Sequence, residues 1–82
     1  MTTQTKYDAT AKIIKIVAQH FEKNESELES TSPLKNLGAD EFDMIEIVMK
    51  VEDEFGIVID DSDVDSLISI DSFSSFISDI KK

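Results

Sequence analysis

Apolar residues spaced three and four apart predict a long first helix over about residues 6–21, where no glycine or proline interrupts the pattern. Its apolar face is made of Tyr7, Thr10, Ile13, Ile14, Val17, Ala18 and Phe21. We expect this face to pack in the core. His20, the single histidine, is expected at the surface or at its boundary. Residues 1–5 are polar, and we expect them to be frayed.

A second helix is predicted from Asp40, a good N-cap, to Phe55, with Gly56 at the position where helices turn into the left-handed conformation. At about 100° per residue, this helix has two apolar faces. One consists of Met44, Ile47, Val48, Val51 and Phe55, and we expect it in the core. The nearly opposite face consists of Phe42, Ile45 and Met49, flanked by Glu46, Glu52 and Asp53. An apolar centre with a charged border predicts a docking surface, with packing beneath residues 22–37 as the alternative.

The connections between helices follow from their turn-forming and apolar residues. Residues 22–37 form a long link rich in Ser, Thr and Asn, in which Leu28, Leu34 and Leu37 are expected to contact the core. The apolar run 57–59 has no partner strand, so we interpret it as a buried loop segment. Gly38 allows a turn before the second helix.

Two further helices complete the predicted fold. The first is short, over about residues 60–67, with Val64, Leu67 and Ile68 directed inward. The second begins near a cap at Asp71 or Ser72 and ends at Lys81 and Lys82, which suit its C-terminal dipole. Its apolar face is Ile70, Phe73, Phe76 or Ile77, and Ile80. The chain is therefore predicted to be all-α, a small four-helix bundle of three main helices and one short helix, in a single domain over residues 1–82.

The formal net charge of −10 is concentrated in one part of the chain. Residues 40–65 contain eleven acidic residues and one basic residue, Lys50, whereas the rest of the chain is balanced. Such a field attracts a basic partner and repels nucleic acid. The alternative is a hydrated face that only improves solubility.

The residues needed for several kinds of chemistry are missing from the sequence. There is no cysteine, which excludes disulfides and thiolate metal sites and fits a reducing compartment. There is also no catalytic Ser/His/Asp set and no glycine-rich phosphate loop, so we expect no enzyme and no catalytic residue. No stretch approaches the ~18 apolar residues of a membrane span, and no signal peptide is recognised. A cytoplasmic monomer is expected.

Asp61, Asp63 and Asp65 have the spacing of a calcium-binding loop. Ser66 and Ser72 stand where that loop requires glycine and a bidentate glutamate. A specific metal site is therefore not expected, and weak divalent-cation binding remains the least favoured of the functions considered.

Residues 37–59 resemble the attachment motif of the acyl carrier proteins, and the resemblance extends over essentially the whole chain. The matching features begin with Leu-Gly-Ala-Asp at residues 37–40, followed by the attachment position at residue 41 and then by Phe42 and Asp43. They continue with the helix that contains Glu-Ile-Val-Met and Val-Glu-Asp-Glu-Phe, and with the acidic short helix. The resemblance implies a bundle whose core can open to hold a fatty chain. It also implies docking of the second helix onto basic patches of synthases, reductases, dehydratases and acyltransferases of fatty-acid, lipid or polyketide-type biosynthesis. Carried over by position, the docking residues are Asp40, Phe42, Asp43, Ile45, Glu46, Met49, Glu52, Asp53 and Ile59.

The sequence departs from this family at Glu41. The family has a serine there, whose hydroxyl forms a phosphodiester with 4′-phosphopantetheine. A carboxylate cannot form that bond, and Ser32 and Ser62 lie outside the motif. The resemblance therefore implies this cofactor for the family but not for this chain, and modification by a phosphopantetheinyl transferase only if residue 41 were serine.

Three explanations for Glu41 remain open. The first is an engineered exchange in a carrier, and the second is a natural change in a protein that lost transport and kept docking or regulation. The third, which adds a mechanism to either of the others, is a negative charge at the helix N-terminus that partly imitates the phosphate. The alternative function is that of a regulatory or structural interaction protein without acyl chemistry.

Overall fold

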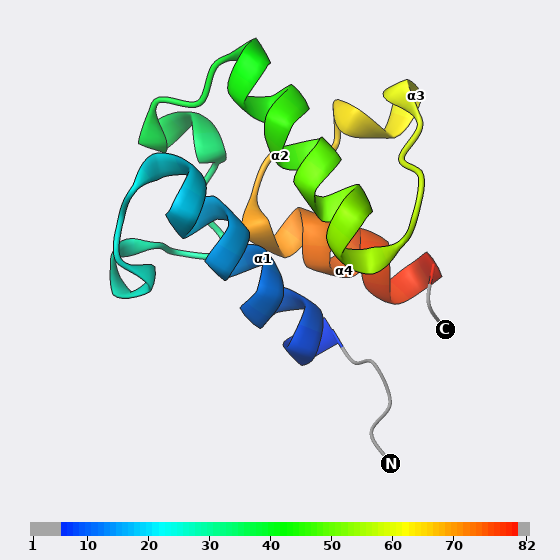
Figure 1. Cartoon of the computed structure of the whole chain (residues 1–82), viewed down its shortest axis with the longest axis horizontal. Helices are drawn as coiled ribbons and strands as arrows, with labels where there is room; N and C mark the ends of the chain where they lie inside the picture. Colours follow the sequence, from blue (N-terminus) through cyan, green and yellow to red (C-terminus); the bar gives the residue numbers. More distant parts are fainter. Residues whose placement is uncertain (1–5, 81–82) are drawn as a thin grey trace.

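The computed structural model describes residues 6–80, with side chains from residue 9 onward, and this part of the chain is helical. Its helices are α1 (Lys6–Phe21), α2 (Glu41–Phe55), α3 (Asp61–Val64) and α4 (Ile70–Ile80), with 3₁₀ turns η1 (Glu25–Glu27) and η2 (Leu34–Leu37) (Figure 1). The predicted fold of three main helices and one short helix is confirmed. Within residues 6–80, no helix is long and apolar enough to cross a membrane. The predictions for residues 1–5, the Tyr7 side chain, Lys81 and Lys82 lie outside the described part.

The core lies where α1 packs against α4 and, less extensively, against α2. It is built from Ala9, Ile13, Val17, Leu34, Ile47, Val48, Val51, Phe55, Ile59, Leu67, Ile70, Phe73 and Ile77. Burying each of the larger side chains contributes about 1.5–3 kcal/mol relative to leaving it in water. One polar contact crosses this core, because the Thr10 hydroxyl donates to the buried Ser74 Oγ at 2.7 Å. Ser74 in turn donates to the Ile70 carbonyl at 3.1 Å, so its hydroxyl is satisfied within α4.

Both α1 and α2 end through a residue in the left-handed conformation. Gly56 has φ 65° after α2, and its N–H donates to the Glu52 carbonyl at 2.8 Å, as predicted for this glycine. Glu22 has φ 56° after α1, and the next N–H, that of Lys23, donates to the Ala18 carbonyl at 2.9 Å. The hydrogen bonds that close the two helices satisfy carbonyls that have no partner within the helix.

The connection over residues 22–37 is attached to the start of α4 by backbone hydrogen bonds. The Leu34 N–H donates to the Ile68 carbonyl at 2.7 Å, and the Asp71 N–H donates to the Ser30 carbonyl at 2.8 Å. Leu34 is buried, while Leu28 and Leu37 are partly buried against the core. The predicted core contacts of this connection are confirmed.

Two predictions near α4 were wrong. The side chain at its N-terminus is Ser69, whose Oγ accepts the Ser72 N–H at 3.2 Å, whereas Asp71 and Ser72 lie inside the first turn. Ile68 was expected inward and is 56% exposed. It follows the buried Leu67 in an extended segment, where successive side chains point to opposite sides.

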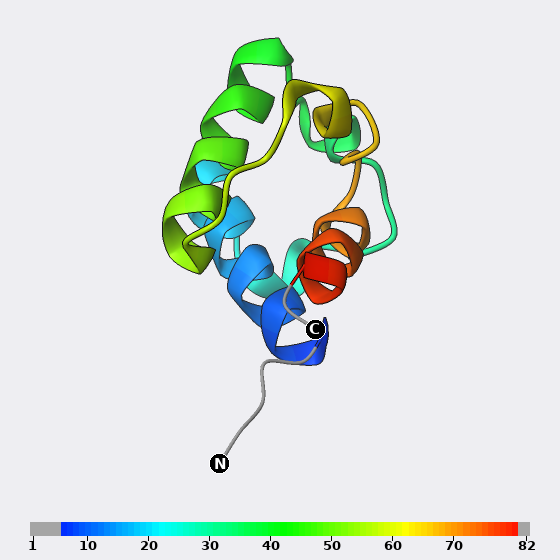
Figure 2. The same ribbon diagram turned by 90° about the vertical axis from the view of Figure 1, so that its right-hand side faces the viewer.

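The loop over residues 56–60 runs back beside α2, so that α3 lies near the N-terminal half of that helix (Figures 1 and 2). No strand forms there or elsewhere in residues 6–80, as predicted. Ile59 anchors the loop, since it is 6% exposed and its N–H donates to the Glu52 Oε2 at 2.8 Å. Val58, next to it, is 84% exposed, so the expected burial of the run 57–59 is wrong at this residue. This arrangement places one segment of the loop in the core and leaves a space between α2 and α3.

Candidate functional site

The N-terminus of α2 is fixed by a reciprocal pair of hydrogen bonds between Asp40 and Asp43. The Asp43 N–H donates to the Asp40 Oδ1 at 2.9 Å, and the Asp40 N–H donates to the Asp43 Oδ2 at 3.0 Å. This capping box satisfies two N–H groups, one of them in the first turn, and confirms Asp40 as the N-cap. Glu41, the first residue of the helix, is exposed. Its carboxylate lies where the helix dipole favours negative charge.

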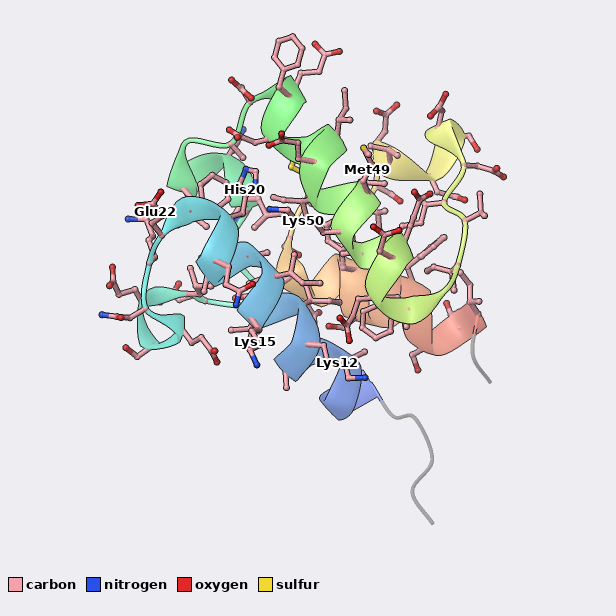
Figure 3. All side chains as sticks on the ribbon, viewed as in Figure 1. Lys12, Lys15, His20, Glu22, Met49 and Lys50 are labelled. Carbon is pink, nitrogen blue, oxygen red and sulfur yellow. The ribbon has the colours of Figure 1, made fainter. Side chains whose placement is uncertain are left out.

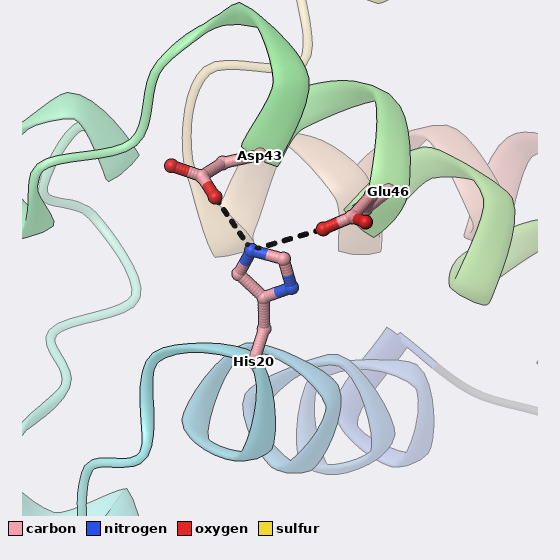
Figure 4. Close-up of side chains that lie close together, drawn as sticks. All are labelled: His20, Asp43 and Glu46. Carbon is pink, nitrogen blue, oxygen red and sulfur yellow. Dashed lines mark hydrogen bonds and ion pairs between the residues drawn. The ribbon is translucent and has the colours of Figure 1, made fainter.

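His20 connects the end of α1 to α2 through a polar network that the sequence did not reveal. Figure 4 shows its Nε2 directed at both carboxylates, 2.9 Å from Asp43 Oδ1 and 3.8 Å from Glu46 Oε1. Lys50 approaches the other ring nitrogen, with Nζ 3.3 Å from Nδ1 (Figure 3). An ammonium group can only donate, so Nδ1 is the acceptor and the ring proton lies on Nε2, facing Asp43. His20 as a whole is half-buried, although its side chain is only 7% exposed, which confirms a boundary position.

This network lowers the pKa of Asp43 from its ordinary value of 3.8. The hydrogen bond from His20 is the main cause, followed by the backbone N–H of Asp40, because both favour the charged carboxylate. Asp43 therefore caps α2 with one oxygen and joins α2 to α1 with the other.

Among the described residues, one group could hold a metal ion: His20, Asp43 and Glu46. Their ligand atoms all lie within 4.8 Å of one another. Lys50, 3.3 Å from the same imidazole, adds a positive charge that disfavours a cation there. The hydrogen bonds between His20 and α2 already explain why these residues meet.

The outer face of α2 is an exposed apolar surface, defined by Phe42, Ile45 and Met49. These side chains are 77%, 50% and 57% exposed, respectively. The alternative, in which they pack beneath residues 22–37, is therefore wrong. Asp40, Glu41, Glu46 and Asp53 are exposed around them, and this group is named here the acidic border. The labelled bases Lys12 and Lys15 lie on α1 instead (Figure 3).

Besides Asp40, Asp43 and Glu46, two more of the expected docking residues, Ile59 and Glu52, have contacts within the chain. Ile59 is buried in the core and does not belong to the exposed surface, because its side chain belongs to the cluster that anchors residues 56–60. Glu52 is half-buried and accepts the Ile59 N–H, so part of its carboxylate stabilises that loop. No local pattern in the sequence indicates this hydrogen bond, because it joins residues seven positions apart.

A pocket of about 760 Å³ opens between α2, α3 and η2. Its apolar wall is formed by Pro33, Leu34, Ala39, Met44, Ile45, Val48, Met49, Ile59, Val64, Leu67 and Ile68. Four acidic residues, Glu41, Glu52, Asp61 and Asp65, and one base, Lys35, also line it. The first residue of α2 thus borders both the outer face of that helix and this pocket.

Comparison with known proteins places this site in a family. Residues 11–77 match the family model described as a phosphopantetheine attachment site. The chain is also 37% identical over 75 residues to the acyl carrier protein of Zymomonas mobilis. The aligned region covers 90% of this chain and 96% of that protein. The chain belongs to the acyl carrier protein family. Acyl carrier proteins are carrier proteins and not enzymes. By its family, this chain is therefore a carrier-type protein, as predicted.

The fold of the family is the fold described above. The solved structure of the acyl carrier protein from Enterococcus faecalis matches with a TM-score of 0.78 at 27% identity, covering 93% of this chain and 98% of that one. The predicted bundle of acyl carrier protein type is confirmed. 4′-Phosphopantetheine is accordingly a cofactor of the family.

The residues at the start of α2 do not fit covalent attachment of that group. Attachment to a side chain requires a hydroxyl, and residues 38–55 contain no Ser, Thr or Tyr. Glu41 offers a carboxylate in the first turn, where the sequence resemblance expects the attachment serine.

Proposed function

We propose that this chain is an acyl-carrier-type docking protein that presents the outer face of α2 to basic partner enzymes and does not carry 4′-phosphopantetheine. The observation that carries the proposal is the exposed Phe42, Ile45 and Met49 within the acidic border. Exposed aromatic and methionine side chains are typical of the centre of a protein interface, and charged residues are typical of its rim. The partners are acyl-synthesis or acyl-transfer enzymes of fatty-acid, lipid or polyketide-type biosynthesis in the cytoplasm.

The charge distribution supports a basic partner over an acidic or neutral one. All of the net charge of −10 falls within residues 40–65, which include α2 and α3. Lys50, the base in this stretch, is turned toward His20 on α1 and leaves the acidic border unopposed (Figure 3). Such a surface accelerates encounter with a positive patch, and the effect weakens as salt is added.

Docking is tested by exchanging one acid of the border for a base. Asp53 is exposed, and its side chain makes no hydrogen bond or ion pair within residues 6–80. Asp53→Lys should therefore weaken binding to a fatty-acid-type acyltransferase with a basic patch by about tenfold or more, with unchanged helicity by circular dichroism. Glu25→Lys, an equal charge change on η1, is the matched control and should bind as the native chain does.

Binding that is insensitive to both Asp53→Lys and salt would contradict the docking proposal. A regulatory or structural interaction protein without acyl chemistry is the second candidate, and Glu41 favours it because that residue removes the attachment hydroxyl. The identity of the partner distinguishes the two candidate functions. The first predicts binding to acyl-processing enzymes, and the second predicts none.

A further inference from the structure

The cluster of His20, Asp43 and Glu46 brings one imidazole and two carboxylates to the same place. Figure 4 shows the three side chains converging between the end of α1 and the first two turns of α2, with His20 Nε2 2.9 Å from Asp43 Oδ1 and 3.8 Å from Glu46 Oε1. Tetrahedral Zn²⁺ sites, with bonds of about 2.0–2.2 Å, place ligand atoms roughly 3.3–3.6 Å apart. The two distances fall on either side of that range, and the exposed Glu46 side chain can make most of the adjustment.

Two of these three side chains are held in position by other contacts. The His20 side chain is 7% exposed, and its ring lies edge-on to the Phe21 ring with the centroids 4.8 Å apart. Asp43 accepts the Asp40 N–H with Oδ2, which leaves Oδ1 directed at the imidazole. An ion bound to Oδ1 therefore leaves the capping box of α2 intact. Ligands that are already ordered lose little conformational freedom on binding, which favours a specific site over diffuse attraction.

We propose that His20 Nε2, Asp43 Oδ1 and Glu46 Oε1 bind one Zn²⁺ ion, with water in the remaining position. The two carboxylates balance the charge of the ion. The imidazole stays neutral, because its proton moves from Nε2 to Nδ1 when Nε2 binds the metal. The ion joins α1 to α2 where the His20–Asp43 hydrogen bond joins them without metal. The proposal involves no residue of α3 and does not depend on docking of a partner enzyme.

Lys50 is the group that opposes this ion. Its Nζ lies 3.3 Å from His20 Nδ1, the nitrogen that carries the proton once Nε2 binds metal, so the ammonium group has to withdraw. Lys50 is exposed, and the exposed Glu54 follows it by four residues on α2, where the two side chains can pair. Lys50 therefore lowers the affinity for Zn²⁺ without occupying a ligand position.

The choice of Zn²⁺ over Mg²⁺ or Ca²⁺ follows from the histidine. Imidazole nitrogen suits Zn²⁺, whereas Mg²⁺ and Ca²⁺ take oxygen ligands. The acidic residues of α2 and α3 attract every divalent cation by charge alone, whatever its ligand preference. Selectivity for Zn²⁺ therefore distinguishes a site at His20 from that general attraction.

The native chain tests the site directly. Zn²⁺ and Mg²⁺ are titrated separately into ¹⁵N-labelled protein at neutral pH and moderate salt, which screens diffuse attraction to the acids. Zn²⁺ should bind as one ion per chain, at least about tenfold more tightly than Mg²⁺. It should also move the imidazole ¹⁵N signals of His20 to those of a ring with metal on Nε2 and a proton on Nδ1. Equal affinities for the two ions, or imidazole signals that Zn²⁺ leaves unchanged, would overturn the proposal.

Two variants test the ligand and the opposing charge. His20→Gln keeps a side-chain N–H that can face Asp43 but removes the imidazole, so it should weaken Zn²⁺ about tenfold or more and leave Mg²⁺ unchanged. Lys50→Gln should strengthen Zn²⁺ binding about two- to fivefold, because it removes the opposing charge. Lys15→Gln, the same exchange at an exposed position on α1 (Figure 3), is the control and should have a smaller effect.

Unchanged Zn²⁺ affinity in His20→Gln, or an equal gain in both lysine variants, would mean that Zn²⁺ is attracted by net charge and not held by this cluster. The imidazole signals are measured on the native chain, so they remain decisive even if a variant misfolds.

Discussion

The inner face of α2 buries Ile47, Val48 and Val51 at 0–8% exposure, whereas the outer face leaves Phe42, Ile45 and Met49 at 50–77%. Both faces are apolar and lie on one fifteen-residue helix. They differ in what surrounds them, since α1 packs against the inner face and the acidic border surrounds the outer one. The spacing of apolar residues therefore indicates only that a helix face can be buried. The residues around that face determine whether it is buried within the chain or remains exposed for another protein.

The largest expected effect is a difference in folding stability between variants of the inner face and variants of the outer face. Ile47→Ala should lower the free energy of unfolding by about 2–5 kcal/mol, because it leaves a cavity in the core. Phe42→Ala removes a larger side chain and should change it by less than about 0.5 kcal/mol, because that side chain is already in water. Urea unfolding measures both. A comparable loss in the two variants would mean that the outer face is packed within the monomer.

A smaller effect separates two acids that the sequence places in the same cluster. Asp40→Ala should cost about 1 kcal/mol, since it removes the side chain that accepts the Asp43 N–H at the start of α2. Asp53→Ala should be neutral or slightly stabilising, since it relieves repulsion without losing a hydrogen bond. Equal changes in unfolding free energy would remove the distinction between capping and border acids.

The dependence of stability on pH should isolate Asp43. Because its pKa is lowered in the folded chain, Asp43 stabilises the fold above its ordinary value of 3.8, and this stabilisation disappears as the pH falls through the lowered value. Asp43→Asn should therefore be less stable than the native chain near about pH 7, and the difference should shrink below about pH 4. A constant difference for Asp43→Asn would show that the contact with His20 contributes nothing.

Added salt should give the smallest of these effects. Folding gathers the acids of residues 40–65 on α2 and α3, so NaCl or Mg²⁺ should raise the melting temperature by screening their repulsion. Thermal unfolding at low and high salt measures this. A melting temperature that does not respond would mean that the acids are too dispersed to repel one another.

The helices and their ends could be predicted from the sequence because those signals are local. The spacing of apolar residues gave α1, and Asp40 and Gly56 gave the two ends of α2. Each of these depends on neighbours within about four residues, which the sequence displays directly.

The features that could not be predicted from the sequence have a different origin. The pair His20–Asp43, the hydrogen bond from the Ile59 N–H to Glu52 and the pocket all join residues that lie more than one helical turn apart in the sequence. Helical periodicity assigns a residue to a face, but only tertiary packing determines what that face meets. The cap at Ser69 was missed for a smaller reason, since several neighbouring serines and aspartates satisfied the same local rule.

We propose that docking and cofactor attachment are separated at residue 41. The native chain and Glu41→Ser are incubated with a phosphopantetheinyl transferase and coenzyme A, and the intact masses are recorded. The native chain should keep its mass, and Glu41→Ser should gain one phosphopantetheine group, because only the serine supplies the hydroxyl. A native chain that gains the group would contradict the reading of Glu41, and a Glu41→Ser chain that stays unmodified would contradict the assignment of this position as the attachment site.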